Sequence, residues 1–126
     1  MSLTNGFETT ILQFAFTAGA VARPTAWYIG LFTSAPGEAG GGTEVAGGAY
    51  ARESVAFNVT GNLATNAAAI EWPTAGASWG TLTHIAIFDA ATAGTMLAYA
   101  PLTLAKTIDA GDVFRIPAGD LDITID

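Results

Sequence analysis

Short segments in which apolar and polar residues alternate recur along most of this chain, separated by the Gly, Pro and Asp residues that are typical of turns. The segments expected to form strands are residues 27–32, 53–59, 67–72, 82–88, 96–104, 113–116 and 121–125. Short strands at such regular spacing predict a mainly β fold, either an antiparallel β-sandwich of jelly-roll or immunoglobulin-like type or a barrel. A parallel α/β fold is not expected, because it would need helices between the strands.

One α-helix is expected, over about residues 5–17, so the prediction is a single β-sandwich domain, residues 1–126, with an N-terminal helix. Asn5 is the expected N-cap, and Glu8 completes a capping-box pattern with it. The apolar residues at helical spacing are Phe7, Ile11 and Ala15 in one row and Leu12 and Phe16 in another. We expect this helix to pack over one end or edge of a sheet, and a helix that docks on a partner is the alternative. The two differ in whether Phe7, Phe14 and Phe16 are all buried.

The longest expected connection, about residues 34–50, is rich in glycine. Its glycines are Gly37, Gly40, Gly41, Gly42, Gly47 and Gly48. Loops of more than about 12–15 residues are uncommon in compact domains unless they are functional or are held by another part. We therefore expect a projecting loop that a rigid β scaffold anchors at both ends. Within that scaffold, Gly30 predicts a bulge or a close backbone approach, and Pro101 predicts an edge position or a bend. Gly61 and Asn62 predict a turn.

The chain has few charges for its length. Of its 126 residues 51% are hydrophobic and 12% are charged, about half of the usual ~25%. Part of the neutral surface is therefore expected to face another protein, and a homo-oligomer is predicted. The net charge is −7, and the four basic residues are scattered as Arg23, Arg52, Lys106 and Arg115. Nucleic acid and anionic membranes are not expected partners, because binding to them needs clustered Lys and Arg.

Residue types that carry chemistry are scarce. The absence of cysteine excludes disulfides, thiolate nucleophiles and zinc–thiolate sites. His84 is the single histidine, and Ser34, Ser54 and Ser78 lack the GxSxG pattern of a nucleophile elbow. We predict no catalytic residue and no enzymatic activity. The N-terminus lacks the features of a secretory signal, and no apolar run approaches the ~18 residues of a membrane span.

No metal site or other cofactor is predicted. The aspartates near the C-terminus are Asp109, Asp112, Asp120, Asp122 and Asp126. Calcium takes such oxygen ligands, but the spacing does not match an EF-hand, and we interpret these residues as turn formers and solvated strand faces. The glycine-rich loop lacks GxxxxGK[ST] and carries Glu38 and Glu44, so nucleotide binding is not expected.

Aromatic residues leave one alternative function, a carbohydrate-binding module that recognises a host-surface glycan. Trp79, in the Gly/Ala/Ser connection of residues 74–81, is the best candidate for stacking on a sugar. Several aromatic rings exposed together on one face would favour sugar binding, whereas a buried set would favour a scaffold.

Four parts of the chain resemble a family of small bacteriophage virion proteins, the tail-fibre-like or minor tail proteins. They are AsnGlyPheGlu at 5–8, TrpTyrIleGlyLeuPheThrSerAlaProGly at 27–37, GlyThrGluValAlaGlyGlyAlaTyrAlaArg at 42–52, and residues 79–90 together with 118–126. The family pattern for the third part is usually GlyThrGluValSerGlyGlyGlyTyrAlaArg, so Ala46 and Ala49 replace a serine and a glycine. These changes are expected to leave the loop workable.

The resemblance implies a structural component of the virion, made in the host cytoplasm, without enzymatic activity. It leaves open a place in a tail fibre, the tail tip, the head–tail junction or a head-spike base. In such a protein the loop at 36–50 would order on assembly, with Tyr50 and Arg52 as anchors, because both residue types are enriched at interface hot spots. The alternatives are a core ring for Tyr50 and a strand-start charge for Arg52. The candidate interface residues are thus Tyr50, Arg52 and Trp79.

Overall fold

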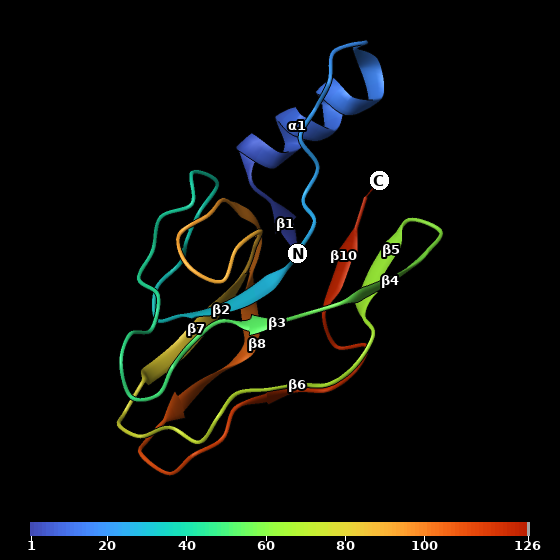
Figure 1. The fold of residues 1–126 in the computed structure, drawn as a ribbon. Helices are drawn as coiled ribbons and strands as arrows, with labels where there is room; N and C mark the ends of the chain where they lie inside the picture. Colours follow the sequence, from blue (N-terminus) through green and yellow to red (C-terminus); the bar gives the residue numbers. More distant parts are fainter. Residues whose placement is uncertain (126) are drawn as a thin grey trace.

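The computed structural model describes residues 1–125 and is mainly β, with one helix (Figure 1). In chain order the elements are β1 (Ser2–Leu3), α1 (Asn5–Phe16), β2 (Tyr28–Phe32), β3 (Glu53–Ser54), β4 (Phe57–Thr60), β5 (Leu63–Asn66), β6 (Ile70–Glu71), β7 (Gly80–Phe88), β8 (Met96–Ile108), β9 (Arg115–Ile116) and β10 (Asp122–Thr124). The predicted fold class, mainly β with one N-terminal helix, is confirmed.

The strands form three antiparallel sheets. A five-stranded sheet has the order β1-β8-β7-β2-β3, a three-stranded sheet the order β10-β5-β4, and β6 pairs with β9. The main core lies on one face of the five-stranded sheet, where Ile29 and Ile87 meet Ile70 and Ile116 of the β6–β9 pair. The sheets thus share a core as in an antiparallel sandwich, although they do not close around it.

The opposite face of the five-stranded sheet carries a second, smaller apolar cluster of Phe32, Ala86, Phe88 and Met96. Side chains of a strand point alternately to its two faces, so β2 sends Ile29 and Leu31 to the main core and Phe32 to the second cluster. Both faces of β2 are therefore covered, as its continuous apolar sequence predicts.

Residues 53–59, predicted as one strand, instead supply two strands of different sheets. Glu53–Ser54 pair with β2, whereas Phe57–Thr60 pair with β5. Apolar and polar residues continue to alternate where the chain passes from one sheet to the other, so the sequence pattern could not reveal the change of sheet. Of the strand predicted at 67–72, only Ile70–Glu71 form a strand, β6, and β5 precedes the predicted range. Gly61, with φ 61°, makes the predicted turn between β4 and β5.

The pairing of β7 with β8 is irregular near Pro101. Leu82 pairs with Lys106, but His84 pairs with Pro101, so residues 102–105 of β8 form a bulge. The predicted bend at Pro101 is present, and β8 continues beyond it to Ile108. Leu82 and Ile85 both lie in the main core, although strict alternation along β7 would place residues three apart on opposite faces.

The helix begins one residue earlier than its sequence signals suggest. The N-cap is Thr4 and not Asn5, because the Thr4 hydroxyl accepts a hydrogen bond from the Phe7 N–H at 3.4 Å. The same hydroxyl donates to the Met96 carbonyl at 2.8 Å, and Thr4 is buried. One side chain thus caps the helix and fastens its first turn to β8.

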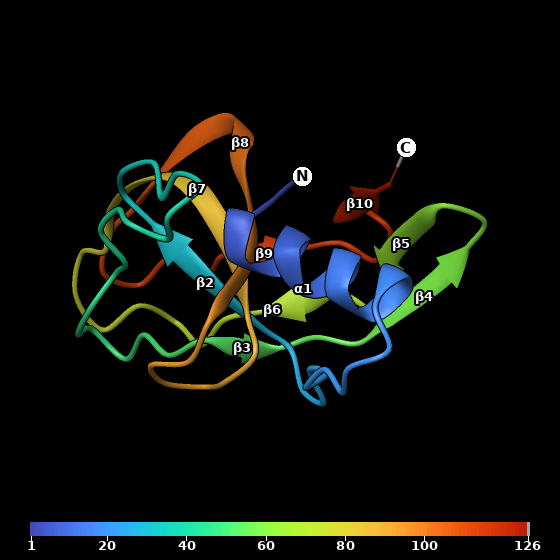
Figure 2. The same cartoon turned by 90° about the horizontal axis from the view of Figure 1, so that it is seen from above.

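The predicted packing of α1 over a sheet is wrong for most of its length. None of its residues is buried, and Phe14 and Phe16 are 73% and 81% exposed. The helix points away from the β body in Figure 1, and Figure 2 shows it crossing between β8 and the β4–β5 hairpin. Within residues 1–125, no helix is long and apolar enough to span a membrane.

Candidate functional site

The connection from β2 to β3, residues 33–52, is divided in two by a contact with the sheet. Glu44 forms a bridge with Phe32, and the Val45 N–H donates to the Leu31 carbonyl at 2.9 Å. Residues 38–43 remain exposed on one side of this contact, and residues 46–52 return to β3 on the other. The loop predicted to project as one piece is therefore held at its middle as well as at its ends.

Arg52 is the centre of the second half of this connection. Its Nε and Nη2 donate to the two carboxylate oxygens of Glu44 at 2.9 and 2.8 Å, a bidentate pair. Its Nη1 donates to the carbonyls of Ala90 and Ala93 at 3.0 and 2.8 Å, in the loop between β7 and β8. The guanidinium carbon lies 3.4 Å from the centroid of the Phe88 ring. One cation therefore joins the two loops over the second apolar cluster.

Tyr50 completes the group, which we call the Glu44–Tyr50–Arg52 clamp. Its hydroxyl donates to Glu44 Oε2 at 2.6 Å and accepts a hydrogen bond from the Leu31 N–H at 3.0 Å. The Tyr50 ring lies edge-on to Trp79, with centroids 5.6 Å apart. The three candidate interface residues are thus brought together, and their polar groups bind other parts of the same chain.

Trp79 is buried, only 4% exposed, and does not present its ring to solvent. Its indole Nε1 donates to the Gly48 carbonyl at 2.8 Å, an oxygen that also accepts the Gly76 N–H at 2.9 Å. A Cβ on Gly48 would lie 3.0 Å from that indole nitrogen, and its φ of +59° also favours glycine. This part of the loop therefore packs against the 74–79 connection.

Gly30 makes room for the clamp on β2. A Cβ at this position would lie 3.0 Å from Glu44 Oε2 and 3.1 Å from the Phe88 ring. The close approach predicted from this glycine is therefore present, and what approaches is the Glu44 carboxylate.

The electrostatics of the clamp follow from its burial and its hydrogen bonds. Burial would raise the pKa of Glu44, but the hydrogen bonds from Arg52 and Tyr50 and the Arg52 charge together lower it below its usual value. Burial, and then the hydrogen bond to Glu44, raise the pKa of the Tyr50 hydroxyl far above its usual value. The folded protein therefore holds an ionised Glu44 beside a protonated Tyr50.

The remaining chemical candidates lie apart from the clamp. His84 Nδ1 is 2.8 Å from the hydroxyl of its neighbour Thr83. Asp112 Oδ2 accepts the Asp109 N–H at 2.9 Å, as in a turn. Within residues 1–125 no three His, Asp or Glu side chains gather as metal ligands would, and Asp126 lies outside the described residues.

Sequence reasoning missed Glu44, which was considered only as a charge that would repel phosphate. A usable signal was present, because Glu44 and Arg52 are opposite charges in a chain with few charges, and glycines lie between them. Such a pair in a glycine-rich stretch is suited to closing a loop. The sequence could not show that Tyr50 and the carbonyls at 90 and 93 would join it.

Comparison with known proteins adds to this geometry. A β fold with an internally clamped loop does not by itself identify a function. The family model described as podophage GP4 fiber I protein gp80 matches residues 2–124. The chain therefore belongs to this family of bacteriophage fibre proteins, and the resemblance noted in its sequence is confirmed. It is a virion structural component of fibre type. No curated protein matches the chain.

Removing the arginine of the clamp should destabilise the fold. Arg52→Ala leaves the Glu44 carboxylate without its cation and two carbonyls without their donor, so we expect a loss of about 3 kcal/mol in unfolding free energy. Arg52→Lys should recover little of it, because an ammonium cannot form the bidentate pair. Urea denaturation measures both, with exposed Arg23→Ala as a control that changes stability by less than about 0.5 kcal/mol. Equal effects at positions 23 and 52 would contradict the clamp.

Ala49 should be a strained position. Its φ is 66°, a left-handed conformation that costs a residue with a Cβ about 1 kcal/mol, and the family pattern has glycine there. Ala49→Gly should therefore raise the unfolding free energy by about that amount. Ala46→Gly is the matched control, because Ala46 has no positive φ to relieve, and it should leave the unfolding free energy unchanged or lower it. Thermal melts of the two variants that move in the same direction would contradict this account.

The alkaline stability of the protein should depend on Tyr50. In the unfolded chain tyrosine ionises near pH 10, whereas the folded protein keeps Tyr50 protonated to higher pH. The stabilisation is fully present below about pH 10 and is lost as the pH rises toward the folded pKa. Urea titrations at increasing pH should show a shallower decline for Tyr50→Phe than for wild type. Tyr28→Phe is the control, and a wild-type slope in both variants would refute the prediction.

Proposed function

We propose that this protein is a non-enzymatic part of a phage fibre that acts by holding its position among other virion proteins, and that it forms a homo-oligomer. The observation that carries the proposal is the family match over residues 2–124. The family supports a position in or beside a fibre, and a head–tail junction or head-spike base is the alternative.

The distribution of polar groups supports a structural role. The Arg52 and Tyr50 side chains are committed to Glu44 and to nearby backbone groups. A general acid, general base or nucleophile must instead reach a substrate. Because its polar groups are already bound within the chain, the Glu44–Tyr50–Arg52 clamp is better suited to holding the loop than to catalysing a reaction.

The exposed apolar side chains support assembly through protein contacts. The large exposed hydrophobic residues are Leu12, Phe14, Phe16, Val59, Leu104, Val113 and Ile125. Apolar area of this kind is stabilised when a partner covers it. The tryptophans at positions 72 and 79 are buried, so a glycan would not find its stacking platform there.

Purified phage particles test the proposal. The protein should be detected at constant stoichiometry in particles, and an antibody or tag should place it at a fibre by electron microscopy. Particles made without its gene should lack that density. Absence of the protein from purified particles would overturn the structural role, and binding to a glycan panel with a change in tryptophan fluorescence would favour the carbohydrate-binding alternative.

A further inference from the structure

The helix α1 has apolar residues on two opposite faces. Phe7, Ile11 and Phe14 follow one another at spacings of four and three and share one face, whereas Leu12 and Phe16 lie on the other. A helix with apolar residues on two opposite faces leaves apolar surface in water unless both faces are covered. Here Leu12, Phe14 and Phe16 are all more than half exposed.

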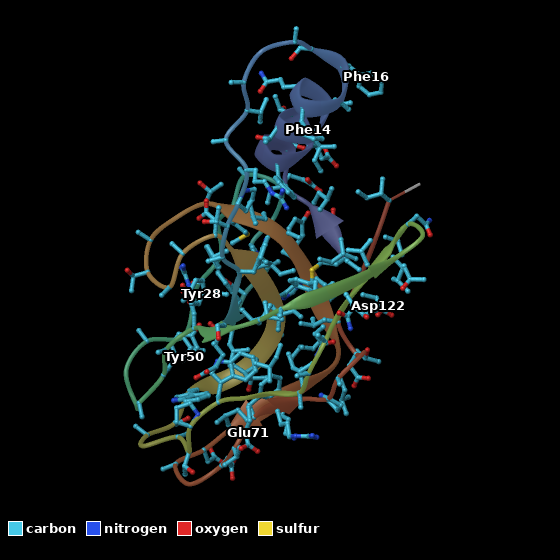
Figure 3. The ribbon with its side chains drawn as sticks, turned by 45° about the vertical axis from the view of Figure 1, so that its right-hand side comes forward. Phe14, Phe16, Tyr28, Tyr50, Glu71 and Asp122 are labelled. Atoms are coloured by element: carbon cyan, nitrogen blue, oxygen red, sulfur yellow. The ribbon has the colours of Figure 1, made fainter. Side chains whose placement is uncertain are left out.

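The body of the protein nevertheless holds the base of this helix firmly. The Asn5 N–H donates to the Glu38 carbonyl at 3.3 Å, and the Thr4 N–H donates to the Leu97 carbonyl at 2.9 Å. The Glu38 carboxylate in turn accepts the Tyr99 hydroxyl at 2.7 Å. Figure 3 shows Phe14 and Phe16 on the half of the helix that lies farther from the β body. The aromatic side chains are thus presented on a fixed support.

An apolar groove runs between α1 and the sheet of β4, β5 and β10, which we call the α1 groove. Its lining includes Phe7, Ile11, Phe57, Val59, Ile123 and Ile125. Val59 and Ile125 are 73% and 53% exposed. The exposed aromatic face and a groove with matching apolar chemistry therefore lie next to each other on one molecule.

We infer that α1 and the α1 groove bind a second copy of this chain, with the helix of each copy packed against the helix and groove of the other. This inference rests on the proposed structural function and names the partner and the surface of its assembly. It is independent of the clamp, which lies at a different part of the fold.

The charge distribution allows two copies of the chain to meet at this surface. The chain carries a net charge of −7, so two copies repel each other over most of their surfaces. Residues 9–22 and 54–70 contain no charged residue, and these segments supply most of the helix and the β4–β5 side of the groove. Self-association of an acidic chain is least opposed where its surface is uncharged.

The amount of apolar surface also suits a second copy. One phenylalanine side chain buries on the order of 200 Å² when it is covered, and each copy offers two that are more than 70% exposed. Together with Leu12, Val59 and Ile125, these side chains bury an area on each copy that approaches the ~800 Å² per partner of a standard interface. A single helix laid on an unrelated flat surface would cover only one of its two apolar faces.

Analytical ultracentrifugation of the full chain tests the inference. Wild type should form an oligomer in the micromolar range, and Phe14→Gln with Phe16→Gln should weaken its dissociation constant by on the order of 100-fold or more. Glutamine favours helix more than phenylalanine does, so unwinding of α1 would not explain the loss. Leu104→Gln, at an 83% exposed leucine on the β8 bulge, should leave the oligomer intact. A monomeric wild type, or equal masses for wild type and the helix variant, would overturn the inference.

The lack of cysteine permits a second test that does not depend on weakening the contact. Ala15→Cys, on the exposed helix, should give a covalent dimer with a short bismaleimide at low protein concentration. Ala110→Cys, in the exposed turn after β8, should give none. Cross-linking at both positions, or at neither, would contradict the proposed surface.

Failure of this inference can be told apart from failure of the proposed function. A protein that is monomeric in solution but present in purified particles would refute the second copy and leave the virion role standing. A protein that oligomerises through α1 but is absent from particles would refute the virion role and leave the contact between copies standing.

Discussion

The bidentate pair between Arg52 and Glu44 is the interaction on which the arrangement of the long loop depends. It lies over Phe88, and it reaches the carbonyls of Ala90 and Ala93 in a loop that is distant in sequence. Without this cation, two connections of a five-stranded sheet would have few reasons to adopt one relative position. A partly buried ion pair is a costly element unless its hydrogen bonds are satisfied, and here Tyr50 and the two carbonyls satisfy them. The strongest polar cluster of the protein is therefore used to hold the scaffold.

The loops and the helix α1 differ in which side chains they bury and which they expose. At the loops, aromatic and charged side chains that a sequence suggests for binding are turned inward, as Trp79 shows with its indole bound to the Gly48 carbonyl. At α1 the reverse holds, because side chains expected in a core are exposed, as Phe16 shows. A stiff body of this kind holds the exposed face of α1 in a fixed direction.

Predictions from the sequence succeeded where local chemistry decides the structure and failed where the sheets divide. The alternation of residues 82–88 correctly indicated β7, and Gly61 correctly marked the β4–β5 turn. The split of 53–59 was missed, because the hydrophobic period does not change where the chain passes from one sheet to another. Of the clamp, Tyr50 and Arg52 were selected as candidate interface residues, and the structure adds their contacts within the chain. Glu44 was not selected, since pairing across eight residues depends on how the glycines between them bend the chain.

What the sequence determined by itself is the β class, the single helix, the glycine-rich loop and the resemblance to phage fibre proteins, because period, turn residues and motifs are local properties of the chain. The tertiary structure alone decided that Thr4 caps the helix, since its hydroxyl needs the Met96 carbonyl of a strand far along the sequence. It also decided that Phe14 and Phe16 are exposed. An apolar pattern states that a face avoids water, but only the packed molecule shows whether its own core covers that face or another molecule must do so.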